Sequence, residues 1–219
     1  EIVLCTDSSH TWRKDFYPMY KANRKKSREA DDKDWQLIFD TLHKVKMEIK
    51  ENFPYRYMYV EGCEADDAIG YMCRYTFKDR RKVIVSSDHD YYQLLDNKTI
   101  IWSPTLKDWV SKKTVIERYR VSASNFCLSK SIAGDKSDNI PGITKVGNKT
   151  ASKWLNQYGN IDDLLAKSNE VTGVVGENLR NEKDILQRNL FLVSLKKDLE
   201  LNLEIDSLNI PEATNDELK

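Results

Sequence analysis

The stretch Val83-Ile-Val-Ser-Ser-Asp-His-Asp90 decides the fold, because a strand-sized apolar run leads directly into two carboxylates. Two other short apolar runs, at residues 2–6 and 57–60, are likewise followed by acidic residues. Between the runs at 2–6 and 57–60, apolar residues recur at steps of three and four from Asp34 onward, which predicts an amphipathic helix. Alternating strands and helices predict an α/β fold with a parallel sheet. The carboxyl ends of parallel strands meet at one edge of their sheet, so the acids are expected to meet there.

We expect the whole chain to divide into an α/β part, residues 1–112, and a helical part, residues 113–219. A second helix should begin at Glu64, a helical turn should follow Asp90, and residues 99–110 should form a strand pair. Residues 8–33 are polar, basic and aromatic without a clean period, which predicts a loop or mobile arm. The polar tail from Asn202 is expected to be a surface segment.

Composition limits the class of protein. With 219 residues, 40% hydrophobic and 32% charged, the chain suits one sizeable core or a core with a small appended domain. No apolar run approaches the roughly 20 residues that a membrane-spanning helix needs. The four cysteines show no zinc-ligand spacing, and we interpret them as reduced core thiols of a cytosolic protein.

The acidic residues after the predicted strands, and at one further place, form four short clusters. They are Asp7; Glu64, Asp66 and Asp67; Asp88 and Asp90; and Asp135 and Asp138. Each cluster alone could simply complement a helix dipole or form a turn. Together they would repel one another at one sheet edge unless a cation bound them. Donor sets made only of oxygen indicate Mg²⁺ or Mn²⁺ rather than zinc.

Basic and aromatic residues are interleaved after Asp7. Seven lysines and arginines stand between Arg13 and Arg28 against one acid, Asp15, although the net charge of the whole chain is zero. Cations suit phosphates and rings suit bases, so this arm could bind nucleic acid. The alternative is an ordinary solvated charge run. Its place after Asp7 favours the first interpretation, with Lys21 and Arg24 able to reach a phosphate held on the metals.

The fourth cluster lies in a glycine-punctuated segment, Gly134-Asp-Lys-Ser-Asp-Asn-Ile-Pro-Gly142, followed by Ile-Thr-Lys-Val-Gly147 and a predicted helix. A glycine-bounded hairpin before a helix amino end exposes backbone N–H groups that can hold a phosphate without reading sequence. Lys145, Lys149 and Lys153 add positive charge. A purely structural hairpin between two helices is the alternative.

These motifs jointly resemble the structure-specific 5′ nucleases, the superfamily of flap endonucleases and 5′-3′ exonucleases. The matching residues are Asp7 with Trp-Arg-Lys, Tyr-Pro-x-Tyr-Lys-Ala-Asn-Arg, Glu-Ala-Asp-Asp, Ser-Asp-x-Asp and Gly-Asp-x-Ser-Asp-Asn-Ile-Pro-Gly. Trp102-Ser-Pro and Lys107-Asp-Trp109-Val are most similar to the phage-type ribonuclease H branch. The resemblance implies a PIN-like twisted parallel sheet flanked by helices, a helical arch, and a carboxyl-terminal helix–three-turn–helix subdomain that binds duplex.

The resemblance also implies an activity and its residues. The expected enzyme is a two-metal phosphodiesterase, a 5′-3′ exonuclease or flap endonuclease acting on DNA and RNA primers during replication. Asp7, Glu64, Asp66 and Asp67 would surround the first Mg²⁺ or Mn²⁺, and Asp88, Asp90, Asp135 and Asp138 would serve the second. Lys21 and Arg24 would contact the scissile phosphate. Other contacts to nucleic acid are expected from Arg13, Lys14, Tyr20, Lys25, Lys26, Gly142, Lys145, Gly147, Lys149 and Lys153.

Further expectations concern partners and neighbouring segments. The resemblance implies a K⁺ ion at the hairpin, substrates with a 5′ flap, a 5′ end or an RNA–DNA hybrid, and replication proteins such as a single-strand-binding protein or a clamp. We expect a monomer in the cytoplasm of a bacterium or a phage-infected host. The family has another strand and aspartate before the strand that begins here, so we expect a segment upstream of Glu1.

Two rival functions remain open: a non-catalytic nucleic-acid-binding module of the same fold, and a ribonuclease of PIN type acting on single strands. The second rival has the acidic centre but does not explain the hairpin between Gly134 and Gly147.

Overall fold

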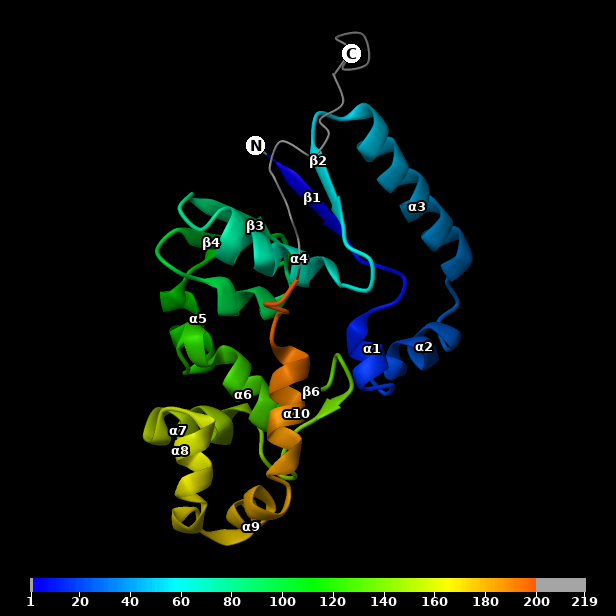
Figure 1. Cartoon of the computed structure of the whole chain (residues 1–219). Helices are drawn as coiled ribbons and strands as arrows, with labels where there is room; N and C mark the ends of the chain where they lie inside the picture. The colour runs from blue at the N-terminus through cyan, green and yellow to red at the C-terminus, as the bar shows by residue number, and fades with distance from the viewer. Residues whose placement is uncertain (1, 200–219) are drawn as a thin grey trace.

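The structure is a computed structural model that describes residues 2–199. Its strands form two parallel pairs (Figure 1). β1 (Val3–Thr6) pairs with β2 (Arg56–Tyr59), and β3 (Lys82–Val85) pairs with β4 (Thr99–Ser103). β5 (Asp108–Val110) adds antiparallel to β4, which confirms the expected strand pair.

The α/β class and the parallel pairing are confirmed, but one continuous sheet is not. Within residues 2–199, the β1–β2 pair and the β3–β4–β5 sheet are separate. A groove of about 810 Å³ lies between them, lined by Val3 and Cys5 on one side and Val83 to Val85 on the other. Val85 is 67% exposed. The strand expected before Glu1 lies outside the described residues.

The segment at 8–33 is a correction. It contains two helices, α1 (Trp12–Phe16) and α2 (Ala22–Glu29), rather than a loop. Lys21 precedes α2 with φ 54°, a left-handed turn that sets the angle between the helices. Four residues of this segment are buried, Ser8, Thr11, Arg13 and Tyr20, and the two largest of them, Arg13 and Tyr20, are 2% and 3% exposed. Long-range contacts therefore order this arm, which has no apolar period of its own.

Helix α3 (Trp35–Asn52) begins where predicted, because the Asp34 carboxylate accepts a hydrogen bond from the backbone N–H of Leu37 at 2.9 Å. Its apolar positions are not buried, and Leu42 and Val45 are about half exposed. Figure 1 shows α3 standing beside β2 at the margin of the molecule. The hydrophobic period of the sequence thus predicted the helix correctly but not its packing.

Helix α4 (Ala65–Tyr71) starts after Glu64 as predicted and continues as a short π-helical turn, η1 (Met72–Thr76). Ala68 and Met72 pack on Met58 of β2 in a small core. A 3₁₀ segment, η2 (His89–Leu94), follows β3 and confirms the helical turn expected after Asp90. Within residues 2–199 all four cysteines are free, as expected, and burial raises the pKa of Cys5 and Cys127 to about 12.

Between residues 112 and 199 the chain is largely helical, as the pattern of that part of the sequence predicted. The elements in order are α5 (Lys112–Tyr119), η3 (Ala123–Asn125), α6 (Phe126–Ala133), β6 (Gly134–Asp135), β7 (Ile140–Pro141), α7 (Asn148–Tyr158), α8 (Ile161–Ala166), η4 (Ser168–Glu170), α9 (Gly173–Asn181) and α10 (Asp184–Val193). The largest apolar core runs from Ile84 and Ile101 of the sheet to Trp154 and Leu186 of the helices. The two parts of the chain therefore share one core. In the part of the chain that the structure describes, no helix has the length and apolar character needed to cross a membrane.

Candidate metal centre

Three of the predicted ligands meet directly. Asp90 opens η2, Asp135 ends β6, and Asp138 lies in the turn before β7. One carboxylate oxygen from each lies within 4.8 Å of the others. The β6–β7 pairing, in which Asp135 stands opposite Ile140, folds the turn so that Asp135 and Asp138 face Asp90 from one side.

Tyr20 connects this group to the Glu64 cluster. Its hydroxyl lies 2.9 Å from Glu64 Oε2 and 3.1 Å from Asp138 Oδ2, and it can donate to either. Lys21 Nζ donates to the other Glu64 oxygen at 2.5 Å. Because Tyr20 is buried, it is a structural link between two carboxylates rather than the nucleic-acid contact expected from the sequence.

The other expected ligands approach the same place by different routes. Asp7, at the end of β1, accepts a hydrogen bond from the backbone N–H of Ala65 at 2.8 Å and so lies at the amino end of α4. Asp88 accepts one from the backbone N–H of Asp90 at 2.9 Å. Within residues 2–199, Asp66 forms no ion pair, and the nearby negative charges of Glu64 and Asp90 raise its pKa. The structure thus brings all four acidic clusters to one end of the strands.

Asp67 does not fit its expected role. It is completely buried, and its two oxygens accept hydrogen bonds from Arg13 at 2.7 and 2.8 Å, from the indole N–H of Trp12 at 2.9 Å and from the backbone N–H of Lys196 at 2.8 Å. These four hydrogen bonds use the lone pairs of both Asp67 carboxylate oxygens. Arg13, buried with it, also binds Glu64 at 3.0 Å and cannot reach a solvent phosphate. We therefore remove Asp67 from the metal ligands and Arg13 from the nucleic-acid contacts.

The electrostatics show an unbalanced negative charge. Burial, together with the negative charges of Glu64, Asp67 and Asp90, raises the pKa of Asp66 to about 8, although Arg13 opposes the shift. Burial also raises the pKa of Asp90 to about 6, although Lys130 lowers it. Buried carboxylates that resist ionisation are relieved by a bound cation.

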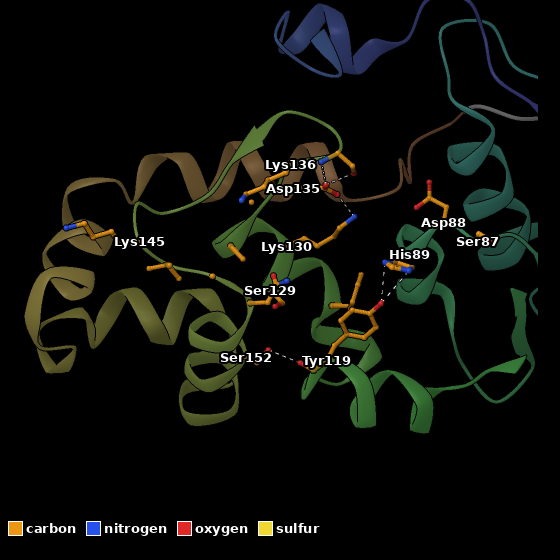
Figure 2. Close-up of a pocket in the computed structure, with 17 residues that line it drawn as sticks. Ser87, Asp88, His89, Tyr119, Ser129, Lys130, Asp135, Lys136, Lys145 and Ser152 are labelled. Atoms are coloured by element: carbon orange, nitrogen blue, oxygen red, sulfur yellow. Dashed lines mark hydrogen bonds and ion pairs between the residues drawn. The ribbon is translucent and has the colours of Figure 1, made fainter. Parts of the chain in front are cut away.

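Lys130 is a member of the site that the sequence did not reveal. It projects from α6, and its ammonium lies 2.6 Å from Asp135 Oδ2 (Figure 2). The same ammonium contacts Asp90 Oδ1. The available signal was a single charge in the otherwise uncharged helix Phe-Cys-Leu-Ser-Lys130-Ser-Ile-Ala. Burial opposes ionisation of Asp135, but Lys130 and Ser137 hold its pKa below the ordinary value.

The two predicted catalytic cations flank the acids. Lys21 pairs with Glu64, and Arg24 of α2 pairs with Asp138 at 2.8 Å. Their side chains are 19% and 48% exposed, so both lie between the carboxylates and solvent. Lys14, Lys25 and Lys26 are exposed on α1 and α2, as a contact to a phosphate backbone requires.

The glycines of the hairpin have different reasons to be there. A Cβ on Gly142 would lie 2.2 Å from the carbonyl carbon of Ala133, so the close approach of β6 and β7 demands glycine. A Cβ on Gly147 would meet nothing within 4 Å. Gly147 is exposed at the amino end of α7, where free backbone N–H groups favour an anion. Lys145, Lys149 and Lys153 are exposed on the hairpin and α7.

A pocket of about 930 Å³ joins the acids to the hairpin, with Asp88, Lys130 and Asp135 at one end and Lys145 and Gly147 at the other (Figure 2). His89 and Tyr119 lie in contact at the Asp88 end of this pocket, with 3.3 Å between the Tyr119 hydroxyl and His89 Nδ1 (Figure 2). The pocket therefore offers one continuous path from the carboxylates to the helix amino end.

Comparison with known proteins agrees with this arrangement. Residues 1–120 match the family model of the 5′-3′ exonuclease N-terminal resolvase-like domain, and residues 121–216 match that of the 5′-3′ exonuclease C-terminal SAM fold. The chain is 37% identical over 147 residues to ribonuclease H of Enterobacteria phage T4, covering 65% of this chain and 46% of that protein. It is 30% identical over 214 residues to DNA polymerase I of Caldicellulosiruptor bescii, covering 94% of this chain and 24% of that protein.

Among solved structures, the T5 D15 protein co-crystallised with metal ions superposes with a TM-score of 0.79 at 25% identity, covering 88% of this chain and 75% of that chain. The chain spans less than half the length of the two curated relatives, the phage T4 ribonuclease H and the C. bescii DNA polymerase I. Both family models together cover nearly all of its length, and the chain belongs to the 5′-3′ exonuclease family.

Proposed function

We propose that this chain is a divalent-metal-dependent nuclease that hydrolyses phosphodiester bonds of nucleic acids from the 5′ side. The observation that carries this proposal is the gathering of acids from three separate segments, with Glu64 and Asp138 joined through Tyr20 and with Asp90 and Asp135 beside Asp138. A structural role alone does not explain this, because buried like charges cost stability.

The donor set suits Mg²⁺ or Mn²⁺. It offers carboxylate oxygens only, and two of the acids have pKa values raised by burial. We assign Asp7, Glu64 and Asp66 to one ion and Asp88, Asp90, Asp135 and Asp138 to a second. When bound, such ions supply Lewis-acid activation of water and of the scissile phosphate. The T5 D15 protein, which has the same fold, was crystallised with metal ions. A K⁺ ion at the hairpin is part of the proposal.

The chain's own residues would position the substrate and balance its charge. Lys21 and Arg24, now paired with Glu64 and Asp138, are placed to exchange these partners for the oxygens of a phosphate and to neutralise charge that develops there. Lys145, Lys149, Lys153 and the N–H groups around Gly147 would hold a second phosphate farther along the duplex. These contacts carry no sequence information, so recognition would depend on the shape and ends of the nucleic acid.

We infer a DNA substrate with a 5′ flap or a 5′ end, and RNA–DNA hybrids as a second substrate. The names of the relatives, a ribonuclease H and a DNA polymerase I, support both. Replication proteins such as a single-strand-binding protein or a clamp are proposed as partners, and a monomer in the cytoplasm as the working form.

A cleavage assay on a 5′-flap DNA duplex tests this function, with Mg²⁺ present or removed by EDTA. Wild-type protein should cleave only with metal, and Asp90→Asn should lose at least roughly 100-fold in rate, as expected for a lost electrostatic group. Asp162→Asn is the matched control, because Asp162 is an exposed carboxylate on α8 and should leave the rate unchanged.

Two results would contradict the proposal. Metal-independent binding of the flap without cleavage would favour a non-catalytic binding module. Equal cleavage of unpaired strands and flap duplexes would favour a single-strand ribonuclease of PIN type.

A further inference from the structure

Lys130 holds a position that a metal ion would otherwise take. Its ammonium lies between Asp90 and Asp135, two of the three acids whose oxygens meet within 4.8 Å. The side chains of Lys130, Asp90 and Asp135 are 17%, 12% and 10% exposed. The ammonium is therefore an internal cation in direct contact with the proposed ligands of the second ion.

The backbone of Lys130 is fixed, but its side chain has somewhere to go. Helix α6 packs against α7 and α10, and Ser131 and Ile132 beside Lys130 are fully buried. Lys130 also lines the pocket of about 930 Å³, together with Ser129, Gly134 and Lys136. The ammonium can thus leave the acids by rotation of its own side chain into this pocket, without movement of the helix.

Lys130 and Ser137 engage several of the carboxylate lone pairs that a divalent ion would use. Asp135 Oδ1 accepts hydrogen bonds from Ser137 N–H at 2.9 Å and from the Ser137 hydroxyl at 2.6 Å, and Oδ2 accepts from Lys130. Asp90 Oδ1 also accepts from Lys130. A dication at these oxygens would meet the ammonium at close range, where like charges in a partly buried site repel strongly.

We propose that Lys130 is the resident cation of the Asp90, Asp135 and Asp138 cluster, and that a divalent ion binds there by displacing its ammonium into the pocket. Lys130 is then a positioning residue that keeps the carboxylates assembled without metal and sets the metal concentration at which the site fills. This inference rests on the proposed metal-dependent function. It adds a competition between the Lys130 ammonium and the divalent ion. This competition weakens metal binding, an effect that a metal ligand or a packing residue at this position would not have.

Calorimetric titration of the metal-free protein with Mn²⁺, in the absence of nucleic acid, tests the inference. Lys130→Met keeps the length of the side chain and removes its charge. It should bind Mn²⁺ at least about tenfold more tightly than wild type, because one charged hydrogen bond is worth about that factor. Lys136→Met is the matched control, since Lys136 is exposed beside Asp135 and makes no ion pair to it among residues 2–199. Its affinity should stay within about threefold of wild type, the size of a surface charge effect.

The outcomes separate the two claims. Unchanged or weaker Mn²⁺ binding by Lys130→Met overturns the competition while leaving the metal site intact. No Mn²⁺ binding by any of the proteins overturns the metal-dependent function and the inference with it.

A second measurement uses wild-type protein and therefore does not depend on the folding of a variant. Brief acetylation of lysines, followed by mass spectrometry, should label Lys130 more rapidly with Mg²⁺ than with EDTA, because the displaced amine enters the pocket. Equal or slower labelling with Mg²⁺ contradicts the displacement.

Discussion

Replacing Arg13 by Met should destabilise the protein more than other single changes in the arm at 8–33. Arg13 makes five hydrogen bonds: to Asp67 at 2.7 and 2.8 Å, to Glu64 at 3.0 Å, and to the carbonyls of Leu192 and Ser194 at 2.9 and 3.3 Å. Methionine fills a similar volume but donates none of them. The change therefore isolates the charge and the hydrogen bonds from packing.

The expected magnitude follows from what is left behind. Asp67 has no exposed surface, and without Arg13 it would keep only the indole of Trp12 and the backbone N–H of Lys196 as donors. Breaking a buried ion pair on one side typically costs about 3–5 kcal/mol. Since a domain of this kind has about 5–15 kcal/mol in total, Arg13→Met should lose about 4 kcal/mol and be close to unfolding.

Urea denaturation in EDTA, followed by circular dichroism, measures this loss. The double variant Arg13→Met with Asp67→Leu removes the stranded charge and should regain about 2 kcal/mol or more over the single variant. Lys14→Met, an exposed neighbour on the same helix, should change stability by no more than about 0.5 kcal/mol. The reasoning is refuted if Arg13→Met loses less than about 1 kcal/mol, or if the double variant is no more stable than the single one.

Three further predictions test other parts of the molecule. Gly142→Ala should lower the free energy of unfolding by more than about 2 kcal/mol, because its Cβ would lie 2.2 Å from neighbouring backbone. Gly147→Ala should lower it by no more than about 1 kcal/mol, the scale of a helix cap. Urea denaturation of both variants measures the difference. Without metal, stability should fall as pH rises from about 4 to about 8, since Asp66 has a raised folded-state pKa of about 8, so only the folded protein holds this proton in that range. Asp66→Asn or added Mg²⁺ should reduce the difference in unfolding free energy between pH 5 and pH 8, measured by urea denaturation. An unchanged difference would count against the assigned role of Asp66. Lys21→Met should slow flap cleavage by roughly 100-fold in single-turnover assays, while exposed Lys183→Met should not, and equal rates would remove Lys21 from the reaction.

Local sequence pattern determined the elements that carry the acids. Short apolar runs ending in Asp7 and Asp88 predicted β1 and β3, and the residues after Glu64 predicted α4, because strand and helix periods are set by neighbours along the chain. The sequence also predicted that the acids converge, although the strands that carry them belong to two separate parallel pairs rather than to one sheet.

Only the tertiary structure decided which basic side chains of the arm are accessible to a substrate and which are buried in ion pairs. Arg13 and Lys21 stand in the same basic arm, yet Arg13 is sealed against Asp67 while Lys21 faces the site. Burial arises from the packing of distant segments, and no period along the arm encodes it. The sequence therefore could not assign these residues different roles.

The same reason explains Lys130. Its ammonium contacts Asp90, which lies 40 residues away along the chain, and no local pattern encodes that contact. The sequence by itself determined the elements that carry the acids, the acidic strand ends and the hairpin, all of which arise from short-range pattern, but not the two helices of the arm at 8–33. The three-dimensional packing decided the partner of each charge, because the energy of a charge depends on what surrounds it in space.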